Sequence, residues 1–103
     1  MFDLLGLDML FNAEQRKVGT YKKGGLFVDT CEVSDSDEPY ETAVAHKKYN
    51  KGDIVIVEMY DNLKESEKGH KKWVKKMTSK KLPKELKDVS TSHIAKLYNA
   101  IRA

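Results

Sequence analysis

Residues 54–60, with the sequence IVIVEMY, place the strongest limit on the fold of this chain. The segment is rich in β-branched side chains, which favour an extended strand. Strict alternation puts Val55, Val57 and Met59 on one side of this strand and Ile54, Ile56 and Tyr60 on the other. A sheet with one face in water would show polar residues on that face. We therefore expect both faces to be covered, the second by an N-terminal helix or by another chain.

Three further segments are predicted to pair with this strand. Residues 16–33 have the pattern of a hairpin, with Gly24 and Gly25 at the turn. An acidic loop follows, in which Pro39 holds the preceding residue out of a helix. Residues 40–46 are predicted to form a third strand, with Tyr40, Thr42, Val44 and His46 on one face and Glu41, Ala43 and Ala45 on the other. An antiparallel sheet is expected over residues 16–60.

Helices are predicted on both sides of the sheet segment in the sequence. The main helix spans residues 62–78, where Asn62 and Glu65 fit a capping box. Residues 1–14 are too apolar for a free tail and are expected to form a short docking helix, whereas residues 90–102 carry an amphipathic stripe. The 103 residues therefore predict one α+β domain, a four-stranded antiparallel meander with the main helix packed on one face and short N-terminal and C-terminal helices.

Charge is divided unevenly along the chain. Residues 1–62 hold 7 basic and 12 acidic side chains and residues 63–103 hold 12 basic and 4 acidic, so the two parts carry net charges of −5 and +8. The main helix offers a basic interaction face made of Lys68, Lys71, Lys72, Lys75 and Lys76. Such a face fits a solvated helix, an acidic protein partner or nucleic acid. Lysines give diffuse, salt-sensitive attraction rather than the bidentate recognition that arginine provides.

No motif in the sequence predicts catalysis, a metal site or a cofactor. Cys31, the single cysteine, falls within a strand and is expected to pack as a small core residue. His46, His70 and His93 form no metal-binding pair at short spacing. The acidic loop lacks the glycine and closing glutamate of a calcium-binding loop. We therefore expect a protein that is not an enzyme.

The termini and composition bear on location. No apolar run reaches the roughly 20 residues that span a bilayer. The first ten residues contain two aspartates and no basic residue, so no signal peptide is expected. The sequence therefore predicts no membrane partner.

Several phrases of the sequence occur together in one group of proteins. PYETAVAH, VIVEMYD, GHKKWV and DVST stand in this order between residues 39 and 91. The chain resembles small, functionally uncharacterised proteins of tailed bacteriophages and prophages, which share similar phrases. This resemblance implies a viral gene product located in the virion or in the cytoplasm of the infected bacterial host. It implies no functional residue, because the group has none assigned.

Three hypotheses of function follow. The leading one is a minor structural or assembly component of a virion that contacts other phage proteins or itself through an apolar interface, made of Ile54, Ile56 and Tyr60 or of Leu4, Leu7 and Leu10. The second is an intracellular accessory protein that binds and inhibits a host factor, such as a defence protein. The third is a nucleic-acid binder that acts through the lysine face.

Overall fold

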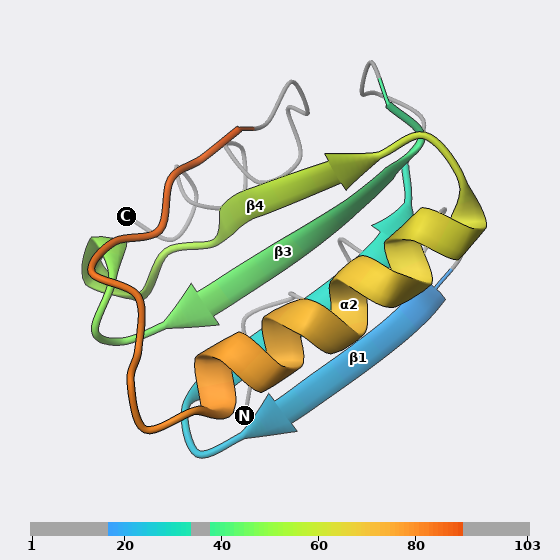
Figure 1. The fold of residues 1–103 in the computed structure, drawn as a ribbon. Coiled ribbons are helices and arrows are strands. Elements are labelled where there is room, and N and C mark those ends of the chain that lie inside the picture. Colours follow the sequence, from blue (N-terminus) through green and yellow to red (C-terminus); the bar gives the residue numbers. More distant parts are fainter. Residues whose placement is uncertain (1–16, 34–37, 90–103) are drawn as a thin grey trace.

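The computed structural model describes residues 17–33 and 38–89 and contains one sheet and one long helix (Figure 1). The elements are β1 (Lys17–Lys23), β2 (Leu26–Glu32), β3 (Tyr40–His46), the short 3₁₀ turn η2 (Asn50–Gly52), β4 (Val55–Tyr60) and α2 (Leu63–Thr78). All neighbouring strands pair antiparallel in the order β1-β2-β3-β4. The predicted α+β meander with one main helix is confirmed. The predicted helices at residues 1–14 and 90–102 lie outside the described residues.

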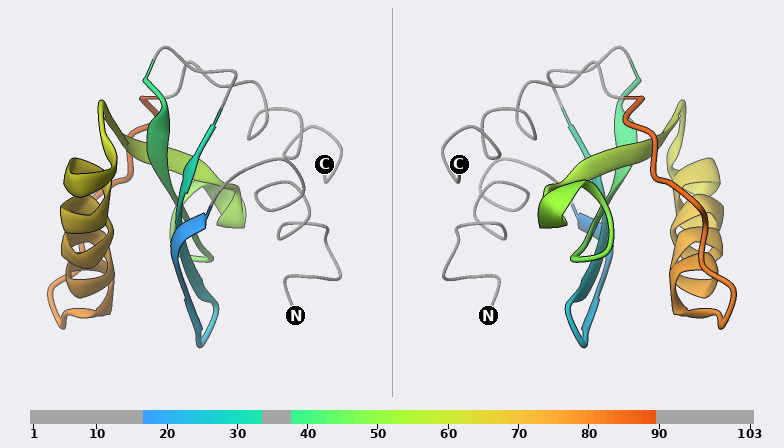
Figure 2. Two further views of the ribbon diagram at one scale, coloured as in Figure 1. Left: turned by 90° about the vertical axis from the view of Figure 1, so that its right-hand side faces the viewer. Right: turned by 90° about the vertical axis from the view of Figure 1, so that its left-hand side faces the viewer.

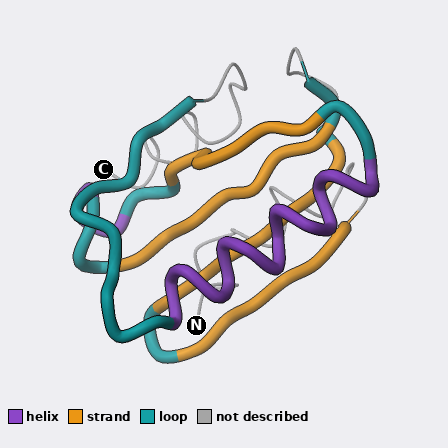
Figure 3. Tube along the Cα trace, in the orientation of Figure 1, coloured by secondary structure: helices purple, strands orange, loops and turns teal. Residues whose placement is uncertain are grey.

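The helix covers one face of the sheet. Viewed along the sheet, α2 lies entirely on one side of the strands (Figure 2). The tube view shows α2 running along the strands, and the segment after it turning back past the end of the sheet (Figure 3). That segment is attached to β4, because the backbone N–H of Val89 donates to the carbonyl of Ile56 at 2.8 Å.

Two local signals in the sequence fix the ends of these elements. Gly24 and Gly25 have φ of +57° and +85°, the left-handed values that a two-residue hairpin turn requires and that glycine adopts without strain. At the start of α2, the side chain of Asn62 accepts a hydrogen bond from the backbone N–H of Glu65 at 2.9 Å. This bond satisfies one of the free donors at the helix N-terminus. The predicted turn and helix cap are therefore both confirmed.

The register of β4 differs from strict alternation. Thr42 pairs with Glu58, but Ala43, the next residue, pairs with Ile56, so Val57 is an extra residue in a β-bulge. From Glu58 onward, each side chain of β4 therefore points to the face opposite to the one that strict alternation predicts. The prediction that grouped Tyr60 with Ile54 and Ile56 is therefore wrong.

Each side of the sheet carries a cluster of buried apolar residues. On the helix side, a cluster of buried residues joins the strands to α2 and to the segment after it: Leu26, Val28, Val44, Tyr49, Val55, Val57, Met77 and Leu86. On the other side lies a second cluster: Phe27, Cys31, Val33, Ala43, Ala45, Ile54 and Ile56, with Met59 packed against it. The expectation that Cys31 is a core residue is confirmed. Both faces of the sheet are covered, as the apolar pattern of residues 54–60 predicts.

Candidate interaction surface

The lysine-rich face of α2 is the candidate interaction surface of the described residues. Ser66, Gly69 and Met77 are the buried residues of the helix. The predicted lysines all lie on its exposed sides: Lys68, Lys71, Lys72, Lys75 and Lys76. The structure therefore places all five side chains on the exposed part of one element.

These lysines differ in what they already contact. The Lys72 amine lies 2.6 Å from the Glu58 carboxylate, in an ion pair between α2 and β4. Lys68 is 3.8 Å from Glu65, one turn away on the same helix. Lys76 lies over the indole ring of Trp73, with its nitrogen 4.6 Å from the ring centroid.

Lys71 and Lys75 stand apart from the other three. Within residues 17–33 and 38–89, neither of these two lysines has an acidic side chain within ion-pair distance. Their charges therefore remain uncompensated by the described part of the fold.

A chain of hydrogen bonds lies beneath α2 and crosses the sheet. His70 Nδ1 is 2.8 Å from the Thr30 hydroxyl, which is 2.6 Å from the Thr42 hydroxyl. The Thr42 hydroxyl is in turn 2.9 Å from the Tyr60 hydroxyl. Tyr60 donates to Glu58 Oε1 at 3.3 Å. These bonds connect β2, β3 and β4 to the helix; Thr30, Thr42 and Tyr60 are buried, whereas His70 and Glu58 at the two ends are partly exposed.

The ionised Glu58 carboxylate determines which group is the donor in each of these hydrogen bonds. An ionised carboxylate only accepts hydrogen bonds, so the proton of Tyr60 points to Glu58. Thr42 must then donate to Tyr60, and Thr30 to Thr42. His70 is left to donate from Nδ1, which assigns the Nδ1–H tautomer to the neutral ring.

Glu58 receives three donors at one oxygen. Besides Tyr60, the Trp73 indole N–H donates to Oε1 at 2.8 Å and Lys72 binds the same atom. Burial alone would raise the pKa of Glu58, but the bonds from Lys72 and Trp73 outweigh burial and hold this pKa below its ordinary 4.5. The carboxylate is thus ionised and fixes the side of α2 that faces β4.

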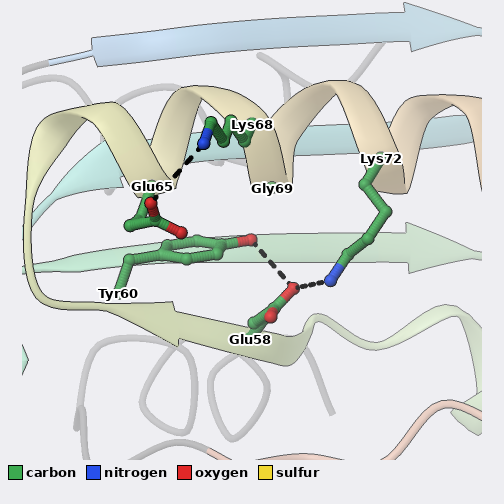
Figure 4. A pocket seen from close by; sticks show the side chains of 6 residues that line it. All are labelled: Glu58, Tyr60, Glu65, Lys68, Gly69 and Lys72. Atoms are coloured by element: carbon green, nitrogen blue, oxygen red, sulfur yellow. Dashed lines mark hydrogen bonds and ion pairs between the residues drawn. The ribbon is translucent and has the colours of Figure 1, made fainter.

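A shallow pocket of about 120 Å³ lies beside this carboxylate (Figure 4). In Figure 4, Glu58 lies between the Tyr60 hydroxyl and the Lys72 amine, and the Tyr60 ring runs beneath the helix at Gly69. A Cβ at Gly69 would lie 2.1 Å from the Tyr60 hydroxyl oxygen, so only glycine permits this approach. The pocket is lined by both acids and lysines, and its groups are largely paired with one another.

Burial also shifts two other groups of this hydrogen-bond chain. It raises the pKa of Tyr60 well above its ordinary 10.0, and Glu58 adds to that rise, so the phenol stays protonated. Burial lowers the pKa of His70 from its ordinary 6.5; Asp29 opposes this shift and Lys17 reinforces it. His70 is therefore a neutral hydrogen-bond donor near neutral pH.

The histidines of the described chain have separate neighbours. His46 accepts a hydrogen bond from the backbone N–H of Lys48 at 3.0 Å and packs beside Tyr49. His70 lies on α2 against Gly19, where an added Cβ would come within 2.7 Å of the imidazole. Among the described residues, no group of three or more metal-binding side chains comes together.

The predicted apolar interface is not a single exposed surface. Ile54, Ile56 and Tyr60 are only 3%, 0% and 6% exposed, and the β4 bulge puts Tyr60 on the helix side. Their burial within one chain leaves no apolar patch at these positions for a partner. The alternative residues Leu4, Leu7 and Leu10 lie outside the described residues.

Comparisons with protein-family models, with curated proteins and with solved structures find no match to this chain. In the described residues, no helix has the length and apolar character needed to cross a membrane.

Proposed function

We propose that this protein is a non-enzymatic, phage-encoded component of virion structure or assembly, and that it contacts an acidic surface of another protein through the lysine face of α2. The observation that carries this proposal is the array of exposed lysines on a helix whose opposite side is fixed to the sheet. Like charges at this density repel one another, and an acidic partner relieves that repulsion.

The framework behind the array supports a binding role. Trp73, Gly69 and Met77 anchor α2 by a hydrogen bond, by close approach and by apolar packing. A helix held at several points presents its lysines with little loss of freedom on binding. The side chains lose only their own rotamer entropy, which favours a stable contact.

The arrangement of polar groups supports the non-enzymatic part of the proposal. A catalytic hydroxyl needs a base that is free to take its proton. Here the hydroxyls of Thr30, Thr42 and Tyr60 are engaged with one another in the hydrogen-bond chain beneath α2. Glu58 is held by Lys72 and Trp73. These groups act to position the helix.

The virion role is tested by counting copies of the protein in purified particles. Quantitative mass spectrometry is calibrated against the major capsid protein of the phage that encodes this chain. We expect a fixed ratio that matches the symmetry of one part of the particle. Absence from particles, with abundance in infected cells, would refute the virion role and favour the host-factor inhibitor.

A further inference from the structure

The two edges of the sheet differ in what lies against them. At the β4 edge, the backbone N–H of Val89 donates to the Ile56 carbonyl at 2.8 Å, so the segment after α2 lies along that edge. β1 forms the opposite edge, and within residues 17–33 and 38–89 it pairs only with β2. Figure 1 shows β1 as the outermost strand on its side of the sheet. The outer side of an edge strand is a row of backbone groups that can pair with another strand.

The register of the hairpin shows which backbone groups of β1 point away from the sheet. Lys23 is opposite Leu26 across the two-residue turn, where the two strands of a hairpin exchange their first hydrogen bonds. Antiparallel pairs alternate between bonded and non-bonded positions, so the backbone of Tyr21 bonds to β2 and that of Thr20 does not. The N–H and C=O of Thr20 therefore point outward, and Thr20 is exposed.

The helix leaves room beside this edge. A pocket of about 250 Å³ lies between β1 and α2, where it is lined by Val18, Glu67, His70 and Lys71. A strand added along β1 would pass this pocket and place one side chain in it. In strand addition, the main-chain bonds give affinity and such pockets give specificity.

The charge of this edge is positive. β1 has the sequence KVGTYKK, with three lysines and no acidic residue. Lys17 forms an ion pair with the buried Asp29. Lys23 and Lys71 are exposed, and in the part of the chain that the structure describes neither lies within ion-pair distance of an acidic side chain. The described lining of the pocket includes one acidic residue, Glu67, beside Lys71, so it does not offset the charge of β1.

From these observations we propose that the outer edge of β1 binds an extended acidic segment of a protein partner, which adds a further strand to the sheet. This inference rests on the proposed function, because it takes the acidic partner from there and specifies the conformation in which it binds. From Val18 to Lys23 the strand extends over about 17 Å. Lys23 ends the strand, and Lys71 lies beside Val18 near its start. Carboxylates near both ends of the added segment would therefore each meet one of these lysines.

A second copy of this chain fits the same edge less well. If β1 pairs antiparallel with β1 of another copy, the register that matches all 7 residues is centred on Thr20 and places Lys17 opposite Lys23 twice. Like charges directly opposite each other destabilise a sheet. An acidic segment replaces this repulsion by attraction, which favours a different protein as the partner.

Two peptides with the same sequence and charge test for an added strand. Each has about eight residues, with a glutamate near both ends and valines and threonines between them, which favour an extended conformation. One peptide has an ordinary backbone, whereas the other carries methyl groups on its inner backbone nitrogens and lacks the N–H donors of a strand. Fluorescence anisotropy measures the Kd of each at about 50 mM salt, where ionic contacts are strong. We expect the ordinary peptide to bind at least about tenfold more tightly.

Two substitutions test the outward N–H of Thr20. Thr20→Pro removes this N–H, and proline is tolerated on an edge strand where the N–H faces solvent. The change also removes the 2.6 Å hydrogen bond from the Thr20 hydroxyl to Asp29. Thr20→Val removes only that side-chain bond and is the matched comparison. We expect T20P to bind the ordinary peptide at least about tenfold more weakly than T20V, with circular dichroism establishing that both variants are folded.

Two further measurements test the charge and the position of the added strand. K23Q/K71Q removes two exposed lysines at the edge, and K47Q/K48Q removes two exposed lysines after β3. We expect K23Q/K71Q to bind the ordinary peptide about three- to tenfold more weakly than K47Q/K48Q. In the wild-type protein, the amide of Thr20 should exchange with solvent at least about tenfold more slowly when the peptide is bound.

Equal binding of the two peptides, equal binding by T20P and T20V, or unchanged exchange at Thr20 would overturn the added strand. Equal losses in the two lysine variants would overturn its acidic character. Slow exchange at Thr20 in the free protein, together with a dimer mass in sedimentation, would assign the edge to a second copy. Failure of the proposed function is separate. If the peptide tests fail but the protein has a fixed copy number in particles, the added strand is wrong and the virion role stands; if they succeed but particles lack the protein, the reverse holds.

Discussion

The contact between Gly69 and Tyr60 gives a sharp test of how α2 is held on the sheet. In Gly69→Ala, the added Cβ would lie 2.1 Å from the Tyr60 oxygen and 2.3 Å from two ring carbons. Ordinary carbon contacts are about 3.5–4.0 Å, so the helix or the ring must move by about 1.5 Å. Tyr60 is 6% exposed and hydrogen-bonded to Thr42, which leaves it little room to yield.

The size of the effect follows from two opposing terms. Overpacking of a filled site costs about 1–3 kcal/mol, and disturbing the Tyr60 hydrogen bonds adds about 1 kcal/mol. Alanine is better than glycine inside a helix by about 1 kcal/mol. We therefore expect Gly69→Ala to lower the free energy of unfolding by about 1–3 kcal/mol, measured by urea denaturation.

A second background isolates the steric origin. Tyr60→Leu removes the ring atoms that the new Cβ would meet. In that background Gly69→Ala should stabilise the protein by about 1 kcal/mol, because only the helix preference remains. An equal effect of Gly69→Ala in both backgrounds, or a gain in stability in the wild type, would refute this account of the helix–sheet contact.

Three further predictions concern the hydrogen-bond chain beneath α2. Thr42→Val should cost about 1–3 kcal/mol in urea denaturation, because it leaves the Thr30 and Tyr60 hydroxyls without their shared partner, whereas Thr42→Ser should restore most of the loss. The pKa of His70 is lower in the folded protein than in the unfolded chain, so as the pH falls below about 6.5 the unfolded chain takes up a proton on this residue before the folded protein does. The free energy of unfolding should therefore decrease in this range. In His70→Gln, the urea midpoint should show a smaller decrease over the same pH range. Glu58 also has a lowered pKa, but as an acid it stabilises the fold while ionised; that contribution should disappear below about pH 4.5, and Glu58→Gln should lack this acid step. Unchanged pH profiles in the two variants would contradict these assignments.

Much of the fold was predictable because its signals are local. Gly24 and Gly25 supply the positive φ values of the hairpin turn, and Asn62 supplies the helix cap. Cys31 sits in a run of strand-forming residues, which predicts its burial. Each of these predictions needs only neighbours in the sequence.

The bulge in β4 could not be predicted from its own residues. Residues 54–57 are apolar at every position, so an extra residue at Val57 leaves the pattern of hydrophobicity unchanged. Alternation specifies register only where one face is polar. As a result the sequence placed Tyr60 on the wrong face and offered it as part of an interface.

The sequence predicted the five lysines of the face, but it did not predict which of them are paired with other side chains of the protein. Lys72 is compensated by Glu58 from β4, and this pairing depends on where the bulge places Glu58. The roles of Thr30 and Thr42 likewise depend on strand register, since the two are directly paired across β2 and β3. The signal that was available in the sequence is one threonine near the middle of each of two neighbouring strands.

The central claim is that the exposed lysines of α2 recruit the protein to its partner in the virion. The most direct measurement replaces the native gene in the phage with the K64Q/K68Q/K71Q/K75Q variant or with the K47Q/K48Q/K84Q/K87Q control and counts copies in purified particles. The account predicts at least about a tenfold loss of the K64Q/K68Q/K71Q/K75Q variant from particles, with the control retained at the wild-type number. Incorporation of the K64Q/K68Q/K71Q/K75Q variant at the wild-type copy number would contradict this account.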